Sequence, residues 1–242
     1  MESPKIGDIY TRETTKKYNE TTANKGGVER GGGESDVFLL SQIPKNLDGK
    51  AVLDLGSGDG HYSKILHDRG AEIVIALDLS SPMLGEVAAK KNEHKLDRLS
   101  LLKASIDHIP IRADVVDYIF SRFSVMYAAD LPHLMRSLST LLKDTGEILI
   151  QANVAILHDP TGAHEIQDTP IPLQLNLGEH SVEIQNYART KEDYHHAFTS
   201  ANLDIVEEQY FPAHGLSVNP KHPRASTLDF QYVIFRLTKR AQ

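Results

Sequence analysis

Between Lys50 and Asn153, short apolar runs rich in β-forming residues alternate with amphipathic segments that have the period of a helix. This alternation constrains the fold strongly, because neighbouring parallel strands need a crossover connection that is usually helical. Apolar runs of this length predict buried strands. The predicted strands are Ala51–Leu55, Ile73–Asp78, Leu99–Ala104, Val115–Ser121 and Gly146–Asn153. We therefore expect an α/β fold with a mostly parallel sheet.

Capping residues mark where the helices should begin. The Ser-Ser-Pro sequence at 80–82 combines a serine cap with a proline that the first helical turn tolerates. Asp130 precedes a run of leucines at helical spacing, and Thr190 and Asp193 have the spacing of a capping box. The predicted helices are His61–Arg69, Ser81–Lys95, Asp130–Lys143 and Thr190–Ala201.

The chain outside the alternating region follows other patterns. Residues 154–190 are rich in proline and histidine and predict a loop-like insertion or cap. Two strand-like runs, residues 203–211 and 228–239, could close the sheet edge as an antiparallel pair. The first 36 residues are polar and contain a glycine-rich stretch, which predicts a lid or a tail.

Composition narrows the class of protein. The chain has 242 residues, no cysteine and a formal net charge of −7, and its basic residues are scattered. It therefore lacks the basic patch typical of nucleic-acid binding, and no cysteine can form a disulfide or ligate a metal. No apolar run has the length of a signal peptide or a membrane span. We expect a soluble cytoplasmic protein, monomeric or homodimeric, with neither nucleic acid nor membrane as a partner.

A glycine-rich turn follows the first predicted strand and opens the first predicted helix. It runs Asp54-Leu-Gly56-Ser-Gly58-Asp-Gly60. Glycines let a ligand approach the backbone, and the helix N-terminus behind them offers unpaired N–H groups. Asp78 ends the second strand, where a carboxylate can accept hydrogen bonds from both ribose hydroxyls of an adenosine. Because ligands of open parallel sheets lie at the carboxyl ends of the strands, Asp54, Asp78 and Ser121 should converge on an adenosine-type cofactor.

The sequence VLDLGSGDG resembles the first motif of the class I S-adenosylmethionine-dependent methyltransferases. The resemblance implies a Rossmann-like, mostly parallel seven-stranded sheet with an antiparallel last strand. It also implies S-adenosyl-L-methionine as the cofactor. Asp54 and the backbone around Gly56, Ser57 and Gly58 would then hold the methionine end. Asp78 would hold the ribose, and Leu79 and Met83 would pack beside the adenosine.

Three later segments extend the resemblance. Residues 103–110 resemble the loop that brackets adenine, with Ser105 where an acidic residue often stands and Ile106 as a backbone donor. Residues 117–124 resemble the fourth motif, whose backbone near Ser121 and Arg122 would face the sulfonium. Residues 141–150 resemble the helix, turn and strand that end the shared core.

The resemblance also divides the chain. Residues 1–36 would form the lid or tail, in which Tyr18 would contact the carboxylate end of the cofactor. Residues 37–242 would form the methyltransferase domain, with a cofactor-binding core at 50–153 and a substrate-side insertion at about 154–190.

Methyl transfer from a sulfonium is a direct in-line displacement that requires positioning and exclusion of water. The expected acceptor is an oxygen or nitrogen of a small-molecule metabolite. His158 and His180, in the insertion, are candidate catalytic residues because histidine titrates near neutral pH. Candidate residues of the substrate pocket are Tyr127, Tyr187, Arg189 and His214. No metal is expected, because no histidine or carboxylate set has ligand spacing.

Several alternatives stay open at this level. Tyr127 could belong to the core, and Arg189 could either clamp an anion or pair with solvent or Glu192. The acceptor could be a protein or an RNA instead of a metabolite. A nicotinamide-dependent oxidoreductase also places a glycine turn and an acid at these positions, although its fingerprint is G-x-G-x-x-G. The chain could also be a cofactor-binding regulator without catalytic activity.

Overall fold

The computed structural model describes residues 33–158, 170–177, 180–213, 216–223 and 225–241, without the side chains of 175–177, 180–182 and 185. Its centre is a seven-stranded sheet in the order β3-β2-β1-β4-β5-β10-β8. The strands are β1 (Ala51–Leu55), β2 (Ile73–Asp78), β3 (Leu99–Lys103), β4 (Val116–Arg122), β5 (Leu142–Leu157), β8 (Leu203–Pro212) and β10 (Leu228–Lys239). All pairings from β3 to β5 are parallel, whereas β10 runs antiparallel to both β5 and β8. The expected sheet with an antiparallel last strand is confirmed.

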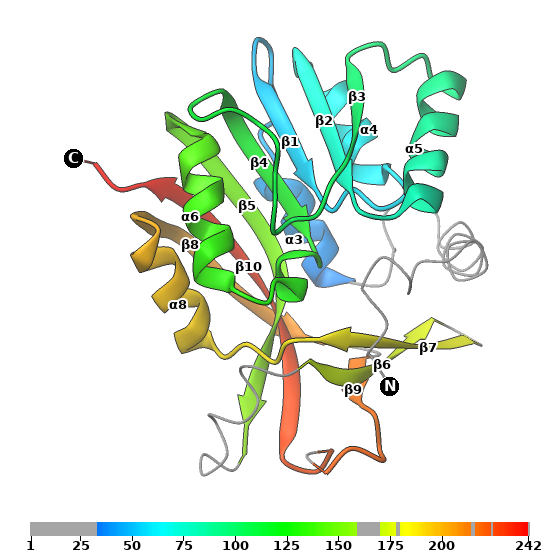
Figure 1. Cartoon of the computed structure of the whole chain (residues 1–242), viewed down its shortest axis with the longest axis vertical. Coiled ribbons are helices and arrows are strands. Elements are labelled where there is room, and N and C mark those ends of the chain that lie inside the picture. The colour runs from blue at the N-terminus through cyan, green and yellow to red at the C-terminus, as the bar shows by residue number, and fades with distance from the viewer. Residues whose placement is uncertain (1–32, 159–169, 178–179, 214–215, 224, 242) are drawn as a thin grey trace.

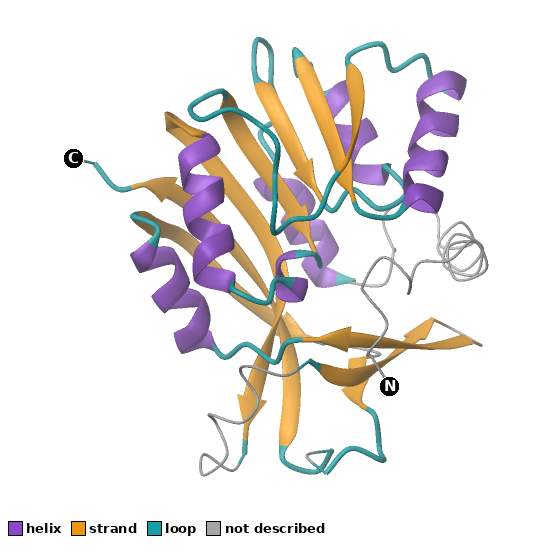
Figure 2. Cartoon of the chain, in the orientation of Figure 1, coloured by secondary structure: helices purple, strands orange, loops and turns teal. Residues whose placement is uncertain are grey.

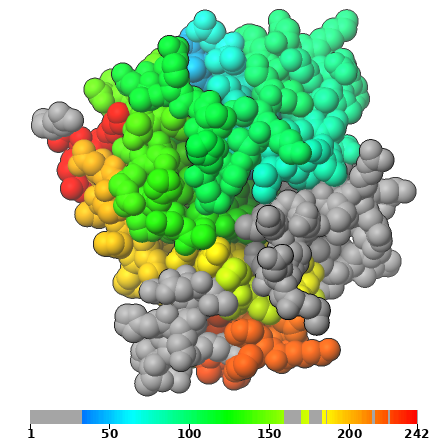
Figure 3. All heavy atoms as spheres, viewed as in Figure 1, coloured from blue at the N-terminus to red at the C-terminus, as the bar shows by residue number. Residues whose placement is uncertain are grey.

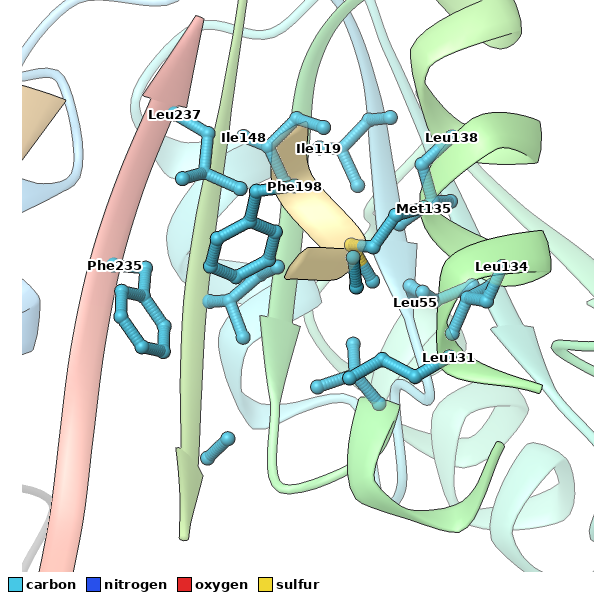
Figure 4. Close-up of a cluster of buried hydrophobic side chains, with 14 of the residues drawn as sticks. Leu55, Ile119, Leu131, Leu134, Met135, Leu138, Ile148, Phe198, Phe235 and Leu237 are labelled. Carbon is cyan, nitrogen blue, oxygen red and sulfur yellow. The ribbon is translucent and has the colours of Figure 1, made fainter. Parts of the chain in front are cut away.

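Helices cover both faces of this sheet (Figures 1 and 2). They are α3 (Glu34–Gln42), α4 (His61–Asp68), α5 (Ser81–Glu93), α6 (Leu131–Leu141) and α8 (Lys191–Ser200), with a 3-10 turn η1 (Val125–Tyr127) before α6. Helices α6 and α8 pack on one face, where Met135 and Phe198 lie against Ile119 and Ile148 of the sheet (Figure 4). Helices α3, α4 and α5 enclose a second apolar cluster on the opposite face.

The predicted helix caps are present. The Ser80 hydroxyl accepts from the Met83 amide, and the Asp130 carboxylate accepts from the His133 amide. Thr190 and Asp193 form a complete capping box. Each cap satisfies amide groups that the helix itself leaves unpaired.

Two element boundaries near α6 differ from the prediction. The helix expected to reach Lys143 ends at Leu141, and the strand expected to start at Gly146 starts at Leu142. The reason is that Leu142 pairs with Val116 of β4, so strand pairing begins immediately after the helix. Helix α3 begins at Glu34 and therefore spans the proposed boundary between residues 36 and 37.

The insertion after β5 is not the loop that its prolines and histidines suggested. It contains β6 (Ile171–Leu177) and β7 (His180–Asn186), which with β9 (Leu216–Val218) form a three-stranded antiparallel sheet. The apolar alternation of Ile171, Leu173, Leu175 and Leu177 is a strand pattern. Prolines at 170 and 172 stand at the start of this strand, where a missing N–H is tolerated.

The small sheet lies beyond the carboxyl ends of β1 and β4, as Figure 1 shows. Strands β5 and β10 extend past the main sheet and share a third apolar cluster with β6, β7 and β9. In the space-filling view of Figure 3, the yellow to orange surface of this sheet lies below the green and cyan surface of the main sheet and its helices. The insertion therefore stands at the edge of the sheet where a ligand is expected.

Candidate functional site

Strand register brings the expected site residues to one edge. In β1, Leu55 pairs with Leu77 of β2 on one side and with Ser121 of β4 on the other. The residues that follow these partners are Asp78 and Arg122. The glycine-rich turn that begins at Gly56 thus lies between the ends of β2 and β4, at the point where a parallel sheet binds ligands.

The three glycines of the turn have positive φ angles, but they face different surroundings. At Gly56 (φ 72°) an added Cβ would lie 2.3 Å from the Cβ of Ser124, so the turn packs directly against the chain after β4. At Gly58 (φ 53°) an added Cβ would meet no atom within 4 Å. Between them, the buried hydroxyl of Ser57 has no hydrogen-bond partner. The turn therefore presents an open position and an unsatisfied polar atom side by side.

Asp54 lies beneath this turn and is almost fully buried. Its Oδ2 accepts a hydrogen bond of 2.5 Å from the hydroxyl of Ser63 on α4. The pKa of the Asp54 carboxyl is raised to about 7, mainly by burial. The hydrogen bond from Ser63 opposes this shift, and the nearby carboxylates of Asp78 and Asp59 add to it. A carboxyl of this kind can change its protonation state when a cation approaches.

Asp78 is held by the backbone on both sides. Its Oδ2 accepts from the amide of Gly58 and its Oδ1 from the amide of Ser80, each at 2.8 Å. Burial raises the pKa of this carboxyl, and the two amide bonds partly offset the increase. Each carboxylate oxygen keeps acceptor capacity for a further donor. Beside it, Leu79 is 39% exposed, whereas Met83 is buried in α5.

Asp59, inside the glycine turn, is a structural residue that sequence reasoning missed. Lys90 of α5 donates to both the carboxylate and the backbone carbonyl of Asp59, at 2.8 Å each. The ion pair is largely buried, and it fixes the turn against α5. The available signal was an acid among the glycines with a lysine on the second helix after them, but their separation of 31 residues hid the pairing.

At the end of β4, serine hydroxyls connect two strands. The Ser124 hydroxyl donates to the carbonyl of Leu55 at 2.7 Å, so the Ser121 hydroxyl must donate to Ser124 Oγ at 2.5 Å. The side chain of Ser121 is thus occupied inside the fold. Between the serines, Phe123 has φ 52°, a conformation that costs a residue other than glycine about 1–3 kcal/mol and that clusters at functional sites.

Arg122 projects toward α3. Its guanidinium donates to Asp36 at 2.7 Å and to the amide oxygen of Gln151 at 2.9 Å, and it lies over the rings of Tyr62 and Phe123. The side chains of Arg122 and Asp36 are only 10% and 2% exposed. This ion pair anchors the first turn of α3 to the carboxyl end of β4.

Of the candidate pocket residues, Tyr127 and Arg189 are buried, and Tyr187 is partly buried against Arg189. Tyr127 is buried in the cluster under α6. Arg189 is also buried; it stacks on the Tyr187 ring and donates to the carbonyls of Ala128 and Ala129 at 3.1 and 2.8 Å. Both alternatives weighed for Arg189, an anion clamp and a pairing with solvent or Glu192, differ from this arrangement, because the guanidinium satisfies carbonyl groups before α6.

The remaining candidates have contacts of their own or lie outside the described residues. His158 is 57% exposed, and its Nε2 lies 3.6 Å from the carboxylate of Asp229. Ser105 bonds to Asp107, and Ile106 packs partly against the core. Tyr18, His214 and the side chain of His180 lie outside the part of the chain that is described.

Sequence reasoning also missed two asparagines, Asn153 near the end of β5 and Asn186 at the end of β7. Each is 1% exposed, and none of their side-chain nitrogen and oxygen atoms has a hydrogen-bond partner. For Asn153 the available signal was an asparagine that ends an apolar run, whereas β7 is mostly polar and gave no such signal for Asn186. Among the described residues, no group of three or more potential ligands could hold a metal ion. The described helices are also too short or too polar to cross a membrane.

Comparison with known proteins decides the family. Residues 53–150 match the family model described as a methyltransferase domain. This range begins inside β1, includes the glycine turn and Asp78, and ends in β5. Residues 53–150 therefore form a methyltransferase domain, which confirms the resemblance to the class I S-adenosylmethionine-dependent methyltransferases.

The relatives of this methyltransferase domain include bacterial enzymes. The biotin biosynthesis bifunctional protein BioHC of Cellvibrio japonicus is 36% identical over 46% of this chain and 21% of its own length. A malonyl-[acyl-carrier protein] O-methyltransferase of Pectobacterium atrosepticum is 33% identical over 46% of this chain and 41% of its own. The aligned regions thus span less than half of either relative.

A solved structure resembles nearly the whole chain. Phosphoethanolamine N-methyltransferase 2 of Haemonchus contortus, in complex with phosphomonomethylethanolamine and S-adenosylhomocysteine, has a TM-score of 0.70. The match is 15% identical and covers 99% of this chain and 61% of the other. At that identity the likeness concerns the fold.

Proposed function

We propose that this protein binds S-adenosyl-L-methionine and transfers its methyl group to an oxygen or nitrogen of a small-molecule metabolite. The observation that carries the proposal is the arrangement at Gly58. Here an open position, the unbonded hydroxyl of Ser57 and the carboxylate of Asp78 meet at the carboxyl ends of β1 and β2.

The residues present fit this cofactor. The open position at Gly58 lets a ligand reach the backbone, and Ser57 offers a hydroxyl whose hydrogen-bonding capacity is unused. Asp78 retains acceptor capacity suited to the two ribose hydroxyls. The exposed side chain of Leu79 adds an apolar surface beside them for a base. Polar groups for a sugar and an apolar neighbour for a ring therefore occur together.

We assign the remaining contacts by likeness to the family. Asp54 and the turn at Gly56–Gly58 would hold the methionine end, and Asp54 would favour an ammonium group because its carboxylate form is otherwise destabilised by burial. Met83, Ser105 and Ile106 would border the adenosine, and Tyr18 would close over the cofactor. The backbone at Ser121 and Arg122 would face the sulfonium.

When bound, S-adenosylmethionine supplies an electrophilic methyl group. The contribution of this chain is to hold an acceptor in line with that group and to exclude water. The ion pair between Arg122 and Asp36 and the serine pair at the end of β4 fix the backbone on this side. The small sheet stands over the same edge and would close the acceptor side.

The names of similar proteins support both oxygen and nitrogen as the methylated atom. One curated relative is an O-methyltransferase, and the similar solved structure is an N-methyltransferase bound to a small molecule. An acceptor hydroxyl must lose its proton, so His158 and His180 stay candidates for the base. We infer a cytoplasmic protein that acts as a monomer or homodimer, with no nucleic-acid partner.

The proposal is tested by calorimetric titration of the protein with S-adenosylhomocysteine. We expect binding, and we expect Asp78→Ala to weaken it about 10- to 100-fold, because hydrogen bonds to a charged acceptor are lost. Asp144→Ala, at a carboxylate that is 92% exposed, serves as the matched control and should bind like the wild type.

Absence of binding by folded wild-type protein would overturn the proposal. Binding of NAD in the same titration, without binding of S-adenosylhomocysteine, would favour the oxidoreductase. Binding that is unaffected by Asp78→Ala would remove the assigned ribose contact.

A further inference from the structure

The mechanism does not use Asn153 or Asn186, although both break a strong structural rule. Each residue is 1% exposed, and each leaves both its amide nitrogen and its amide oxygen without a partner. Buried polar groups in native proteins are nearly always hydrogen-bonded, because an unpaired group loses its water without compensation. Two buried carboxamides without partners therefore indicate either that a ligand bonds to them or that the protein keeps them for its function at the expense of stability.

Asn153 lies near the carboxyl end of β4, where we propose that methyl transfer takes place. It is two residues past Gln151 on β5, and alternation along a strand places both on one face. Gln151 pairs in register with Arg122 and accepts a hydrogen bond from its guanidinium. Across the sheet, Asn153 pairs with Tyr232 of β10, whose ring lies 4.9 Å from the ring of Phe123.

Asn186 reaches the same region from the insertion. The next residue, Tyr187, donates its amide to the carbonyl of Met126 in η1, directly after β4. Further along, the carbonyl of Arg189 accepts from the amide of Ala155 on β5 at 2.8 Å. The segments that carry the two asparagines are thus bonded to each other and to the chain that follows β4.

Other protein groups hold the two guanidinium groups of this region. The guanidinium of Arg122 is bonded to the carboxylate of Asp36, and that of Arg189 to two backbone carbonyls. The side chains of Asn153 and Asn186 are carboxamides, which donate through nitrogen and accept through oxygen. Such groups match a ligand that offers both a donor and an acceptor, such as a hydroxyl or an amide.

We propose that Asn153 and Asn186 are acceptor-binding residues, whose carboxamides hydrogen-bond a neutral hydroxyl or amide group of the methyl acceptor. The inference rests on the proposed methyltransferase function and specifies the acceptor side of that site. It makes the two asparagines determinants of specificity that cost the free protein stability.

The test measures both the stability and the methylation activity of variants at these two positions. In Asn153→Leu and Asn186→Leu, removing an unbonded buried amide should raise the melting temperature of the ligand-free protein by at least about 2 °C. Methylation should fall at least 100-fold in a panel of hydroxyl-bearing and amide-bearing metabolites, followed as S-adenosylhomocysteine formed. Affinity for S-adenosylhomocysteine should stay within twofold of wild type.

Two controls separate the possible causes. Asn92→Leu changes an exposed asparagine on α5 and should leave both melting temperature and methylation unchanged. Alanine variants at 153 and 186 remove the amide without the extra volume of leucine, so a leucine variant that fails by overpacking does not decide the result.

Three outcomes would overturn the proposal. A lower melting temperature in both the leucine and the alanine variants would show that the amides are bonded in the free protein. Full methylation activity in the variants would show that they do not touch the acceptor. Wild-type activity confined to phosphorylated or carboxylate acceptors, or absent from the whole panel, would contradict a neutral acceptor group. Failure of the wild type to bind S-adenosylhomocysteine would instead refute the proposed function itself.

Discussion

Individual glycines of the turn after β1 serve different purposes. Gly56 allows the turn to pack against Ser124, whereas Gly58 faces open space next to the carboxylate of Asp78. Both have positive φ angles, which glycine adopts without the strain of a side chain. Packing therefore requires the first glycine, and access for a ligand is the reason we assign to the second.

Alanine at these two positions should separate folding from binding. Gly58→Ala places its methyl group in open space, so we expect a loss of only about 1–2 kcal/mol from the left-handed backbone, together with at least tenfold weaker binding of S-adenosylhomocysteine. Gly56→Ala forces a methyl group to within 2.3 Å of Ser124, so we expect mostly unfolded protein. Urea denaturation and calorimetry measure the two effects, and equal destabilisation by both variants would contradict this division.

Single elements are held at the site by polar contacts as well as by apolar packing. Helix α3 buries Leu39 against the sheet, but its first turn is fixed by Asp36 to Arg122 and by Ser35 to Gln151. These contacts join α3 to the end of β4 and to β5. A buried ion pair sets position more than it adds stability, and losing one partner leaves an uncompensated charge.

Removal of Asp36 should therefore be costly. We expect Asp36→Ala to lower the free energy of unfolding by about 3–5 kcal/mol, because the Arg122 guanidinium stays buried without its carboxylate. Ser41→Ala, on the exposed side of the same helix, should change it by less than about 0.5 kcal/mol. Urea denaturation at neutral pH gives both values. A loss below about 1 kcal/mol for Asp36→Ala would show that the pair is hydrated.

At the scale of the whole molecule, three apolar clusters support the edge of the sheet at which we propose that the cofactor binds. Two lie on opposite faces of the main sheet, and the third joins the extended ends of β5 and β10 to the small sheet. Asp54 is buried where β1 meets the glycine turn, so its protonation affects the stability of the entire fold.

The pH dependence of unfolding should report Asp54. Its pKa is raised from 3.8 to about 7 in the native protein, so this carboxyl contributes full stability below about pH 4. As pH rises from about 4 to 7, the unfolded chain ionises while the native protein keeps the proton, so that contribution is lost and levels off above pH 7. Relative to Asp54→Asn, the wild type should lose on the order of 4 kcal/mol over this range. A constant difference between the two proteins would show that Asp54 is ionised when buried.

The sequence by itself determined the alternating core, the helix caps and the glycine turn with its two acids, because these depend on local periodicity and on residues adjacent in the chain. It also contained the alternation of β6, which its prolines concealed. Only the tertiary structure paired Asp36 with Arg122, which are 86 residues apart, and turned Arg189 to the carbonyls before α6. Only the tertiary structure shows that Asn153 and Asn186 are buried without hydrogen-bond partners for their side chains. Burial and long-range pairing depend on how distant segments pack, and a local pattern does not encode that packing.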